Sequence, residues 1–377
     1  MENKINLVHI NSYFLTNKLH EELVMSLRDM NASIHQTVYI PINKKDKINS
    51  DYCESKNILY TISKAFSNLE RYFWPLKMLS IYKDFNKKVK NDKITITHAH
   101  SLISNGIISF LLFKKKAIPY VVTVRNTDIN IFMKKSIFFR KIGFKILNSA
   151  ESIMVLSPAY KNIQLRECLT TFQFEQLKDK IKIIPNGVND FWIKNRYLNE
   201  SRSSNCLEIL YVGKLRENKN CSALIKACKL LKEKGLDFQL TIVGEGYLKE
   251  KLQEEAKGLK VRFLGFISDN EQLLKVYRES NLLVVPSFKE SFGLVYVEAM
   301  TQGLPIIYTK GQGFDGNFEE GVVGFSVMPN EYEKIAEAIQ KINENYNEIS
   351  KNAYNYALNF SWTTNSKLLN DIYTKIE

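Results

Sequence analysis

Residues 282–303 read LLVVPSFKESFGLVYVEAMTQG, and this stretch decides the fold. Its first part, Leu282–Val285, is a continuous apolar run with the length of a buried strand, and Pro286 ends it. A loop with Glu290 follows, and Ser291 is a good N-cap for a helix. The apolar positions of that helix share one face: Phe292, Val295, Ala299 and Met300. A buried strand that leads into a helix is the repeating unit of α/β proteins.

The predicted start of this helix offers hydrogen-bond donors to a ligand. The backbone N–H groups of Phe292, Gly293 and Leu294 are first-turn donors that a helix leaves unsatisfied, so they favour an anion or sugar oxygens. Gly293 lets a ligand approach the backbone closely. Glu298 lies roughly two turns into the helix, where its carboxylate can accept hydrogen bonds from two hydroxyls, as on a ribose.

Short apolar runs alternate with helical patterns along the whole chain, for example Ser222–Lys234 and Gly246–Ala256. Such alternation indicates parallel sheets with helices on both faces, and ten strands predict two doubly wound domains with a ligand cleft between their strand ends. The predicted strands are Ile5–Ile10, Thr37–Ile40, Ile94–His98, Tyr120–Val124, Ser152–Leu156, Leu207–Val212, Gln239–Val243, Val261–Phe263, Leu282–Val285 and Pro305–Tyr308.

A polar, turn-rich stretch and a change in charge mark the boundary between the two domains. We expect an N-terminal domain over residues 1–188, a linker over 189–205 and a C-terminal domain over 206–355. Residues 356–377 are expected to form a helix that packs back across the domain boundary.

The composition of the 377 residues is that of a globular protein, with 45% hydrophobic and 25% charged residues. The most apolar stretch, Leu102–Phe113, is shorter than the roughly 18–20 residues that span a bilayer. The N-terminal MENKINLVHI has one Lys and no small-residue cleavage site, so we expect no signal peptide. The five cysteines form no CxxC pair, which predicts reduced structural thiols and a cytoplasmic protein: Cys53, Cys168, Cys206, Cys221 and Cys228.

The positive charge is concentrated in the first half of the chain. Residues 1–185 hold 29 Lys and Arg against 15 Asp and Glu, whereas residues 186–377 hold 24 and 25. Within residues 131–147 basic side chains alternate with large apolar ones, which is typical of an amphipathic segment at an anionic membrane surface. No nucleic-acid-binding motif accompanies the charge, so nucleic acid is not expected as a partner. We therefore expect a peripheral location on the inner face of the plasma membrane.

The frame PS-x-x-E-S-F-G-L-x-x-x-E-A-M-x-x-G-x-P over residues 286–305 resembles the signature of retaining GT-B glycosyltransferases of the GT4 type. Four other segments agree in order: YVGKLRENKN (211–220), IIPNGVN (183–189), TIVGEG (241–246) and VRFLGFI (261–267). The resemblance covers residues 183–310 densely and the first half of the chain thinly. It implies the GT-B fold, two Rossmann-like domains facing a central cleft.

The resemblance also implies roles for individual residues. Lys214 and Lys219 would hold the diphosphate of a nucleoside diphosphate sugar and stabilise it as it leaves. Glu290, with the amides after Ser291, would hold the sugar, and Glu298 the ribose. The remaining donor-side candidates are Gly213, Gly244 and Phe266. The lysines and helix amides take the place of a divalent cation, so neither a metal nor another cofactor is expected.

The first half of the chain departs from the family pattern at two places. In VVTVRNTD, Arg125 stands where the family usually has a histidine that contacts the donor sugar, and Asp128 fits the trailing acidic position. Arginine cannot be a general base, but it can donate hydrogen bonds to the sugar or form a structural ion pair with Asp128. The loop Asn11–His20 lacks the family's Gly-Gly pair. Its polar side chains, with the ITHAH histidines and Asp128, are the acceptor-side candidates: Asn11, Ser12, His98, His100 and Asp128.

The function implied by the resemblance is a retaining transfer of a hexosyl or N-acetylhexosaminyl group to a glycan or lipid-linked acceptor, with UDP-sugars favoured as donors. Bacterial surface polysaccharide or glycolipid synthesis is the expected setting. Two alternatives stay open: a sugar-nucleotide epimerase or phosphorylase on the same fold, and an inactive donor-binding partner of another transferase.

Overall fold

The computed structural model describes residues 4–16, 18–47, 57–89, 93–198 and 206–376. Its chain forms two compact units. Unit 1 comprises Met1–Leu156, Tyr160–Pro185 and Trp362–Glu377, and unit 2 comprises Ser157–Ala159 and Asn186–Ser361. Cys53 and residues 199–205 of the expected linker lie outside the described residues.

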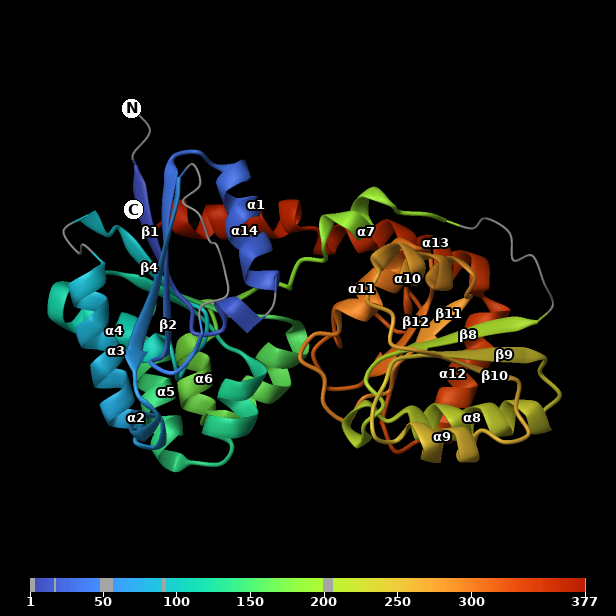
Figure 1. Ribbon diagram of the computed structural model, residues 1–377. Helices are drawn as coiled ribbons and strands as arrows, with labels where there is room; N and C mark the ends of the chain where they lie inside the picture. The colour runs from blue at the N-terminus through green and yellow to red at the C-terminus, as the bar shows by residue number, and fades with distance from the viewer. Residues whose placement is uncertain (1–3, 17, 48–56, 90–92, 199–205, 377) are drawn as a thin grey trace. The chain divides into compact units, whose positions relative to one another are not determined.

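Unit 1 is built on a seven-stranded sheet in the order β3-β2-β1-β4-β5-β6-β7 (Figure 1). Every neighbouring pair is parallel, so all strands end at the same edge of the sheet. The strands are β1 (Ile5–Ile10), β2 (Ile34–Asn43), β3 (Ile58–Phe66), β4 (Ile96–Ala99), β5 (Tyr120–Thr123), β6 (Ser152–Val155) and β7 (Ile181–Ile183).

Two apolar cores cover the two faces of this sheet. One contains Val24 and Leu27 of α1 together with Leu369 and Tyr373 of α14, and the other contains Phe85 of α3. Strand residues alternate between the two cores, as the two-residue period of a strand requires. The helices are α1 (Leu19–Met30), α2 (Asn68–Tyr72), α3 (Trp74–Lys88), α4 (Gly106–Lys116), α5 (Ile137–Ser149), α6 (Thr171–Leu177) and α14 (Trp362–Thr374).

The C-terminal segment is interrupted rather than one continuous helix. A helix ends at Tyr356, a 3₁₀ turn covers Ala357–Phe360, and α14 then belongs to unit 1. The indole Nε1 of Trp362 donates to the Glu22 carboxylate on α1 at 2.8 Å. α14 therefore closes one face of the unit 1 sheet against α1.

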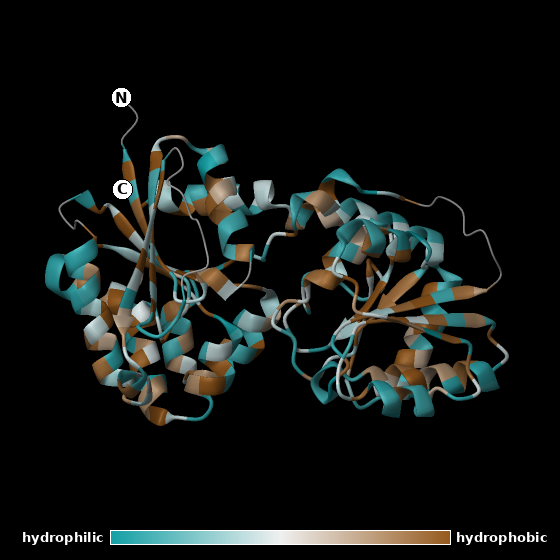
Figure 2. Cartoon of the chain, in the orientation of Figure 1, coloured by the Kyte–Doolittle hydropathy of each residue, from teal (hydrophilic) through white to brown (hydrophobic). Residues whose placement is uncertain are grey.

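Unit 2 has a six-stranded parallel sheet in the order β10-β9-β8-β11-β12-β13. Figure 1 places α8, α9 and α12 on one side of it and α10, α11 and α13 on the other, and Figure 2 shows its strands as apolar and the outer helix faces as polar. The strands are β8 (Leu207–Val212), β9 (Phe238–Val243), β10 (Val261–Gly265), β11 (Leu282–Val284), β12 (Ile306–Thr309) and β13 (Gly324–Val327). The helices are α7 (Asp190–Lys194), α8 (Cys221–Glu233), α9 (Lys249–Glu255), α10 (Asn270–Arg278), α11 (Leu294–Thr301), α12 (Tyr332–Glu344) and α13 (Tyr346–Tyr356).

All ten predicted strands are present, and β3, β7 and β13 are additional. The predicted Thr37–Ile40 is too short, since β2 begins at Ile34 and continues through Pro41 to Asn43. The pairing of β2 with β1 ends at Tyr39, and beyond it β2 pairs with β3. None of the described helices has the length and apolar character needed to cross a membrane.

The loops after β8 and β9 cross at very close range. Gly244 has φ +138°, and a Cβ atom built on it would lie 1.9 Å from the carbonyl oxygen of Gly213. The Gly244 amide donates to the Gly265 carbonyl at 2.8 Å, which holds the end of β10 in the same arrangement. Only glycine fits here, because any side chain would push the two backbones apart.

We expect Gly244→Ala to lower the free energy of unfolding by roughly 2–5 kcal/mol, because backbone strain adds to a steric overlap. The matched control is Gly258→Ala, where φ is +84° and nothing lies within 4 Å of the added Cβ. This control introduces backbone strain without steric overlap, so it should lower the free energy of unfolding by about 1–2 kcal/mol. Urea denaturation followed by circular dichroism measures both, and equal losses would contradict the close crossing.

Candidate functional site

Two side-chain hydrogen bonds join the loops after β8 and β11 of unit 2, and a third joins the loop after β8 to the segment after β13. Asn218 Nδ2 donates to the Lys289 carbonyl at 3.0 Å. Asn220 Nδ2 donates to the carbonyls of Pro286 at 3.0 Å and Pro329 at 2.7 Å. These bonds fix the loop that carries Lys219 against the loop that carries Glu290.

Lys219 and Glu290 form an ion pair at the centre of these loops. Lys219 Nζ lies 2.5 Å from Glu290 Oε2, and the two side chains are 26% and 10% exposed. Ser287 Oγ donates to the same carboxylate oxygen at 3.3 Å, and the Ser291 amide donates to the other at 3.1 Å. An ion pair this shielded from water is stronger than a surface pair, and its partly exposed ammonium can also meet an anion.

Lys214 is held close to this pair through the backbone. The hydroxyl of the buried Tyr211 donates to the carbonyls of both Lys214 and Lys219, at 3.4 and 3.3 Å. The Lys214 side chain is exposed. The structure therefore gathers Lys214, Lys219 and Glu290 at one edge of the unit 2 sheet.

The helix after Glu290 begins later than the sequence suggests. α11 starts at Leu294, and its N-cap is Gly293 in the left-handed region (φ +84°), so the prediction of Ser291 as the N-cap is wrong. A Cβ on Gly293 would lie 2.3 Å from the Tyr296 ring. Phe292 is buried among aromatic rings and precedes the helix, whereas Val295 is only half-buried. The Gly293 and Leu294 amides therefore lie at the helix start, and those of Ser291 and Phe292 lie before it.

Glu298 lies one turn into α11, since the helix begins at Leu294. Its Oε2 accepts a hydrogen bond from the Tyr277 hydroxyl of α10 at 3.0 Å. Burial raises the pKa of this carboxyl to about 7, and the Tyr277 hydrogen bond opposes that rise. A group that donates to the carboxylate would favour its charged form.

Phe266 follows β10, and its side chain is 73% exposed. Gly265, just before it, accepts from the Gly244 amide, so this exposed ring lies beside the crossing of Gly213 and Gly244. The donor-side candidates predicted from the sequence thus lie on the loops after β8, β9, β10 and β11, which are adjacent in the sheet.

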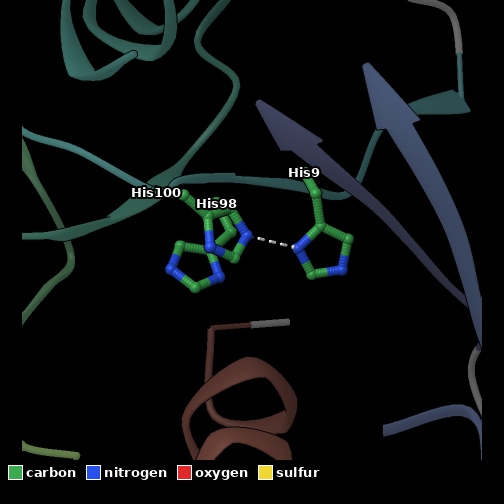
Figure 3. A group of neighbouring side chains, drawn as sticks. All are labelled: His9, His98 and His100. Atoms are coloured by element: carbon green, nitrogen blue, oxygen red, sulfur yellow. Dashed lines mark hydrogen bonds between the residues drawn. The ribbon is translucent and has the colours of Figure 1, made fainter. Parts of the chain in front are cut away.

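In unit 1 a row of histidines lies at the ends of β1 and β4, shown in Figure 3. Gln36 Nε2 donates to the Val24 carbonyl at 3.0 Å, so its Oε1 accepts from His9 Nε2 at 2.9 Å. His9 Nδ1 is then the acceptor for His100 Nε2, also at 2.9 Å. His100 Nδ1 is left as a buried acceptor with no partner among the described residues.

Burial keeps these imidazoles neutral. It lowers the pKa of His9 to about 4, and that of His98 and His100 well below the usual value. His98 has a separate set of partners, with Nε2 at 2.8 Å from Thr123 Oγ1 and Nδ1 at 2.7 Å from the Tyr373 hydroxyl. His98 therefore ties α14 to the sheet.

One nitrogen from each of His9, His98 and His100 lies within 4.8 Å of the others, close enough to share a metal ion. Both nitrogens of His98 already have partners, and its ring stacks on His100 with centroids 4.0 Å apart. A metal ion would have to replace a hydrogen bond of His98. In addition, the nitrogen lone pairs of two stacked rings point in similar directions and do not converge on one ion. The arrangement fits a hydrogen-bonded cluster better, and the absence of a required metal stays a prediction.

The loop after β1, which lacks the Gly-Gly pair, is held by side-chain hydrogen bonds. Ser12 Oγ donates to Asn105 Oδ1 at 2.6 Å, and the Tyr13 amide donates to Asn11 Oδ1 at 2.9 Å. The Nδ2 groups of Asn11 and Asn105 are buried without a partner among the described residues. Sequence reasoning missed Asn105, because a lone asparagine between apolar runs gives no signal of its distant partner.

Asp128 acts on the backbone. Its carboxylate accepts from the amides of Leu102, Ile103 and Arg125 at 2.8–2.9 Å, and burial still raises its pKa to about 6. Arg125 Nε donates to the His100 carbonyl at 3.3 Å. The pair therefore fixes the turn after β5 beside the histidine-bearing strand.

Residues 198–359 match the family described as Glycosyl transferases group 1. An uncharacterized glycosyltransferase of Methanocaldococcus jannaschii is 26% identical over 306 residues, 75% of each chain. A UDP-Gal:alpha-D-GlcNAc-diphosphoundecaprenol alpha-1,3-galactosyltransferase of Escherichia coli is 27% identical over 345 residues, 86% of this chain and 85% of that one.

Solved structures share the fold. The lipopolysaccharide outer core galactosyltransferase WaaB aligns with a TM-score of 0.76 over 98% of this chain and 99% of that one, at 18% identity. HepE of Anabaena, in complex with UDP-glucose, aligns with a TM-score of 0.64 over 98% and 100%, also at 18% identity. This chain therefore has the GT-B fold, and its residues 198–359 match the segment that defines the glycosyltransferases of group 1.

Proposed function

We propose that this glycosyltransferase moves a hexosyl or N-acetylhexosaminyl group from a nucleoside diphosphate sugar to a glycan or lipid-linked acceptor, with retention at the transferred carbon. The observation that carries the proposal is the gathering of Lys214, Lys219 and Glu290 at the strand ends of unit 2, on loops next to Glu298. Two cations suit a diphosphate, and two carboxylates suit the hydroxyls of a sugar and a ribose.

In this proposal the donor enters the existing ion pair. The diphosphate takes the Lys214 and Lys219 ammonium groups, and Glu290 turns to the sugar hydroxyls together with the Gly293 and Leu294 amides. As the bond to the anomeric carbon breaks, negative charge grows on the leaving phosphate, and the two lysines stabilise it. No divalent metal is required for this step, because the lysines supply the positive charge.

Retention is proposed to proceed on one face of the donor, where the leaving phosphate oxygen accepts the proton of the acceptor hydroxyl. This step needs no protein base, so Arg125 in place of the family histidine is compatible with activity. Its guanidinium lies beside His100 through the bond to the His100 carbonyl. We propose that Arg125 donates to sugar or phosphate oxygens.

Unit 1 is proposed to bind the acceptor through the polar groups after β1 and β4. His100 Nδ1 is a hydrogen-bond acceptor without a partner, and the Asn11 and Asn105 amides are donors without one among the described residues. Together with Ser12 they supply both the acceptor and the donor groups that a sugar hydroxyl needs, because a hydroxyl both donates and accepts hydrogen bonds.

The similarity to the galactosyltransferase named for a diphosphoundecaprenol substrate supports a lipid-linked acceptor. The same name, and the UDP-glucose complex of HepE, favour a UDP-sugar as donor. We therefore propose a cytoplasmic enzyme that binds the anionic inner face of the plasma membrane through unit 1. Residues 71–145 of this unit contain 16 Lys and Arg but only 3 Asp and Glu, and this excess of positive charge favours anionic lipids.

Replacing Lys219 tests the diphosphate assignment. We expect Lys219→Ala to lower kcat by roughly 10²–10³-fold, because one cation that stabilises the leaving group is lost. Lys275→Ala, which removes an exposed lysine of α10, is the matched control. Turnover of a panel of UDP- and GDP-sugars measures both, and equal activity of Lys219→Ala and the wild type would contradict the assignment.

The pH dependence of donor affinity tests Glu298. A ribose diol donates to the carboxylate and so favours its charged form, whereas the free carboxyl has a pKa of about 7. Affinity for UDP-glucose should therefore rise by roughly tenfold between pH 5.5 and 8 and then level off. Isothermal titration calorimetry suits this test, because the diphosphate of UDP-glucose does not titrate in that range.

Two variants act as controls for this profile. Glu298→Gln should bind more weakly and show no rise with pH. Tyr277→Phe removes the hydrogen bond that opposes the raised pKa, so its profile should move to higher pH. A profile in Glu298→Gln that matches the wild type would remove Glu298 from the donor site.

A further inference from the structure

One surface of unit 1 exposes large apolar side chains. At the end of α2 and the start of α3, Tyr72 is 86% exposed and Phe73 63%, and at the start of α5, Ile137 is 71% exposed. Apolar residues exposed singly are normal, but a group of them marks a site of interaction. We call this group the apolar ridge: Leu69, Tyr72, Phe73, Leu76, Ile137 and Phe138.

The two parts of the ridge form one surface because Trp74 joins them. Its indole lies edge-on to Phe138 and Phe139, with ring centroids 6.2 and 5.3 Å apart. The start of α3 is thereby packed against the start of α5, although more than sixty residues separate them in the chain. Figure 1 shows α2, α3 and α5 in the same part of unit 1.

The helices that carry the ridge are strongly basic. α3 and α5 together contain seven Lys and Arg and a single acidic residue, Asp84. The Asp84 carboxylate is occupied by the Tyr39 hydroxyl at 2.6 Å. The exposed lysines of these helices are Lys83, Lys87, Lys88, Lys141 and Lys145, and Lys134 and Lys135 precede α5.

We infer that the apolar ridge inserts into the interface of an anionic bilayer while the lysines of α3 and α5 meet the lipid phosphates. The inference rests on the membrane location proposed above and deepens it by naming the inserting side chains. Charge complementarity selects this partner, because exposed apolar side chains on helices that also carry exposed lysines fit acyl chains beneath phosphate headgroups. A purely electrostatic contact would be screened by salt, whereas insertion adds a contribution that salt does not weaken.

Trp74 reports insertion directly. The chain has three tryptophans, and Trp192 and Trp362 are only 3% and 4% exposed. Trp74 is half-buried and packs against the ridge residue Phe138. Lipids brominated on their acyl chains quench a nearby indole on contact, so they should quench Trp74 when the ridge is inserted.

The test uses the full-length protein with vesicles of phosphatidylcholine and phosphatidylglycerol, with and without brominated chains. The wild type should bind, and its fluorescence should be quenched. Phe73→Gln, Leu76→Gln and Ile137→Gln combined should bind roughly tenfold or more weakly, become more sensitive to salt and lose the quenching. The matched control is Leu368→Gln, an exposed leucine of α14 in the same unit, which should behave as the wild type.

The outcomes separate the inference from the proposed function. Binding and quenching that persist in the ridge variant would overturn the insertion, as would binding of the wild type without quenching. Loss of a wild-type dimer in the ridge variant, measured by sedimentation, would assign the ridge to a second copy of this chain instead. Transfer to a water-soluble acceptor should be equal in the wild type and the ridge variant, and its absence in both would count against the enzyme proposal alone.

Discussion

A parallel sheet imposes one constraint on which the rest of this protein depends. A strand can pair in parallel with its neighbour only after the chain has crossed back over the sheet, so every strand ends at the same edge. In unit 2 this brings the loops after β8, β9, β10 and β11 together, and with them Lys219, Glu290 and Phe266. The close crossing at Gly213 and Gly244 is a further result of the same constraint.

The charged groups differ in how far the fold has removed them from water. Glu290 is largely buried but pairs with Lys219 and accepts a hydrogen bond from the Ser291 amide. The histidines after β1 and β4 instead become neutral, because burial lowers their pKa values. Glu298 is intermediate, because burial raises its pKa to about 7. Hydrogen bonds donated to its carboxylate favour the charged form.

Local pattern predicted the strands well and the details of the site less well. Continuous apolar runs marked ten strands but not β3, β7 and β13, which lie at sheet edges and are only partly buried, so their sequences mix apolar with polar residues. Ser291 was predicted as an N-cap, but its amide donates to Glu290 and the helix begins only after Gly293. The left-handed backbone of Gly293 turns the chain into the helix. The partners of His9, His98 and Ser12 could not be foreseen, because Gln36, Tyr373 and Asn105 come from distant segments that only the tertiary fold brings near.

The return of α14 to unit 1 has a consequence for how the protein is made. During synthesis the residues of unit 1 up to Pro185 leave the ribosome first, and the whole of Asn186–Ser361 follows before Trp362 does. Until then the apolar face of α1 and the His98 side chain have neither Trp362 nor Tyr373 to cover them. One face of the unit 1 sheet therefore stays without the cover of α14 until the residues of unit 2 have been synthesised. Folding of unit 1 is in this way tied to completion of the chain.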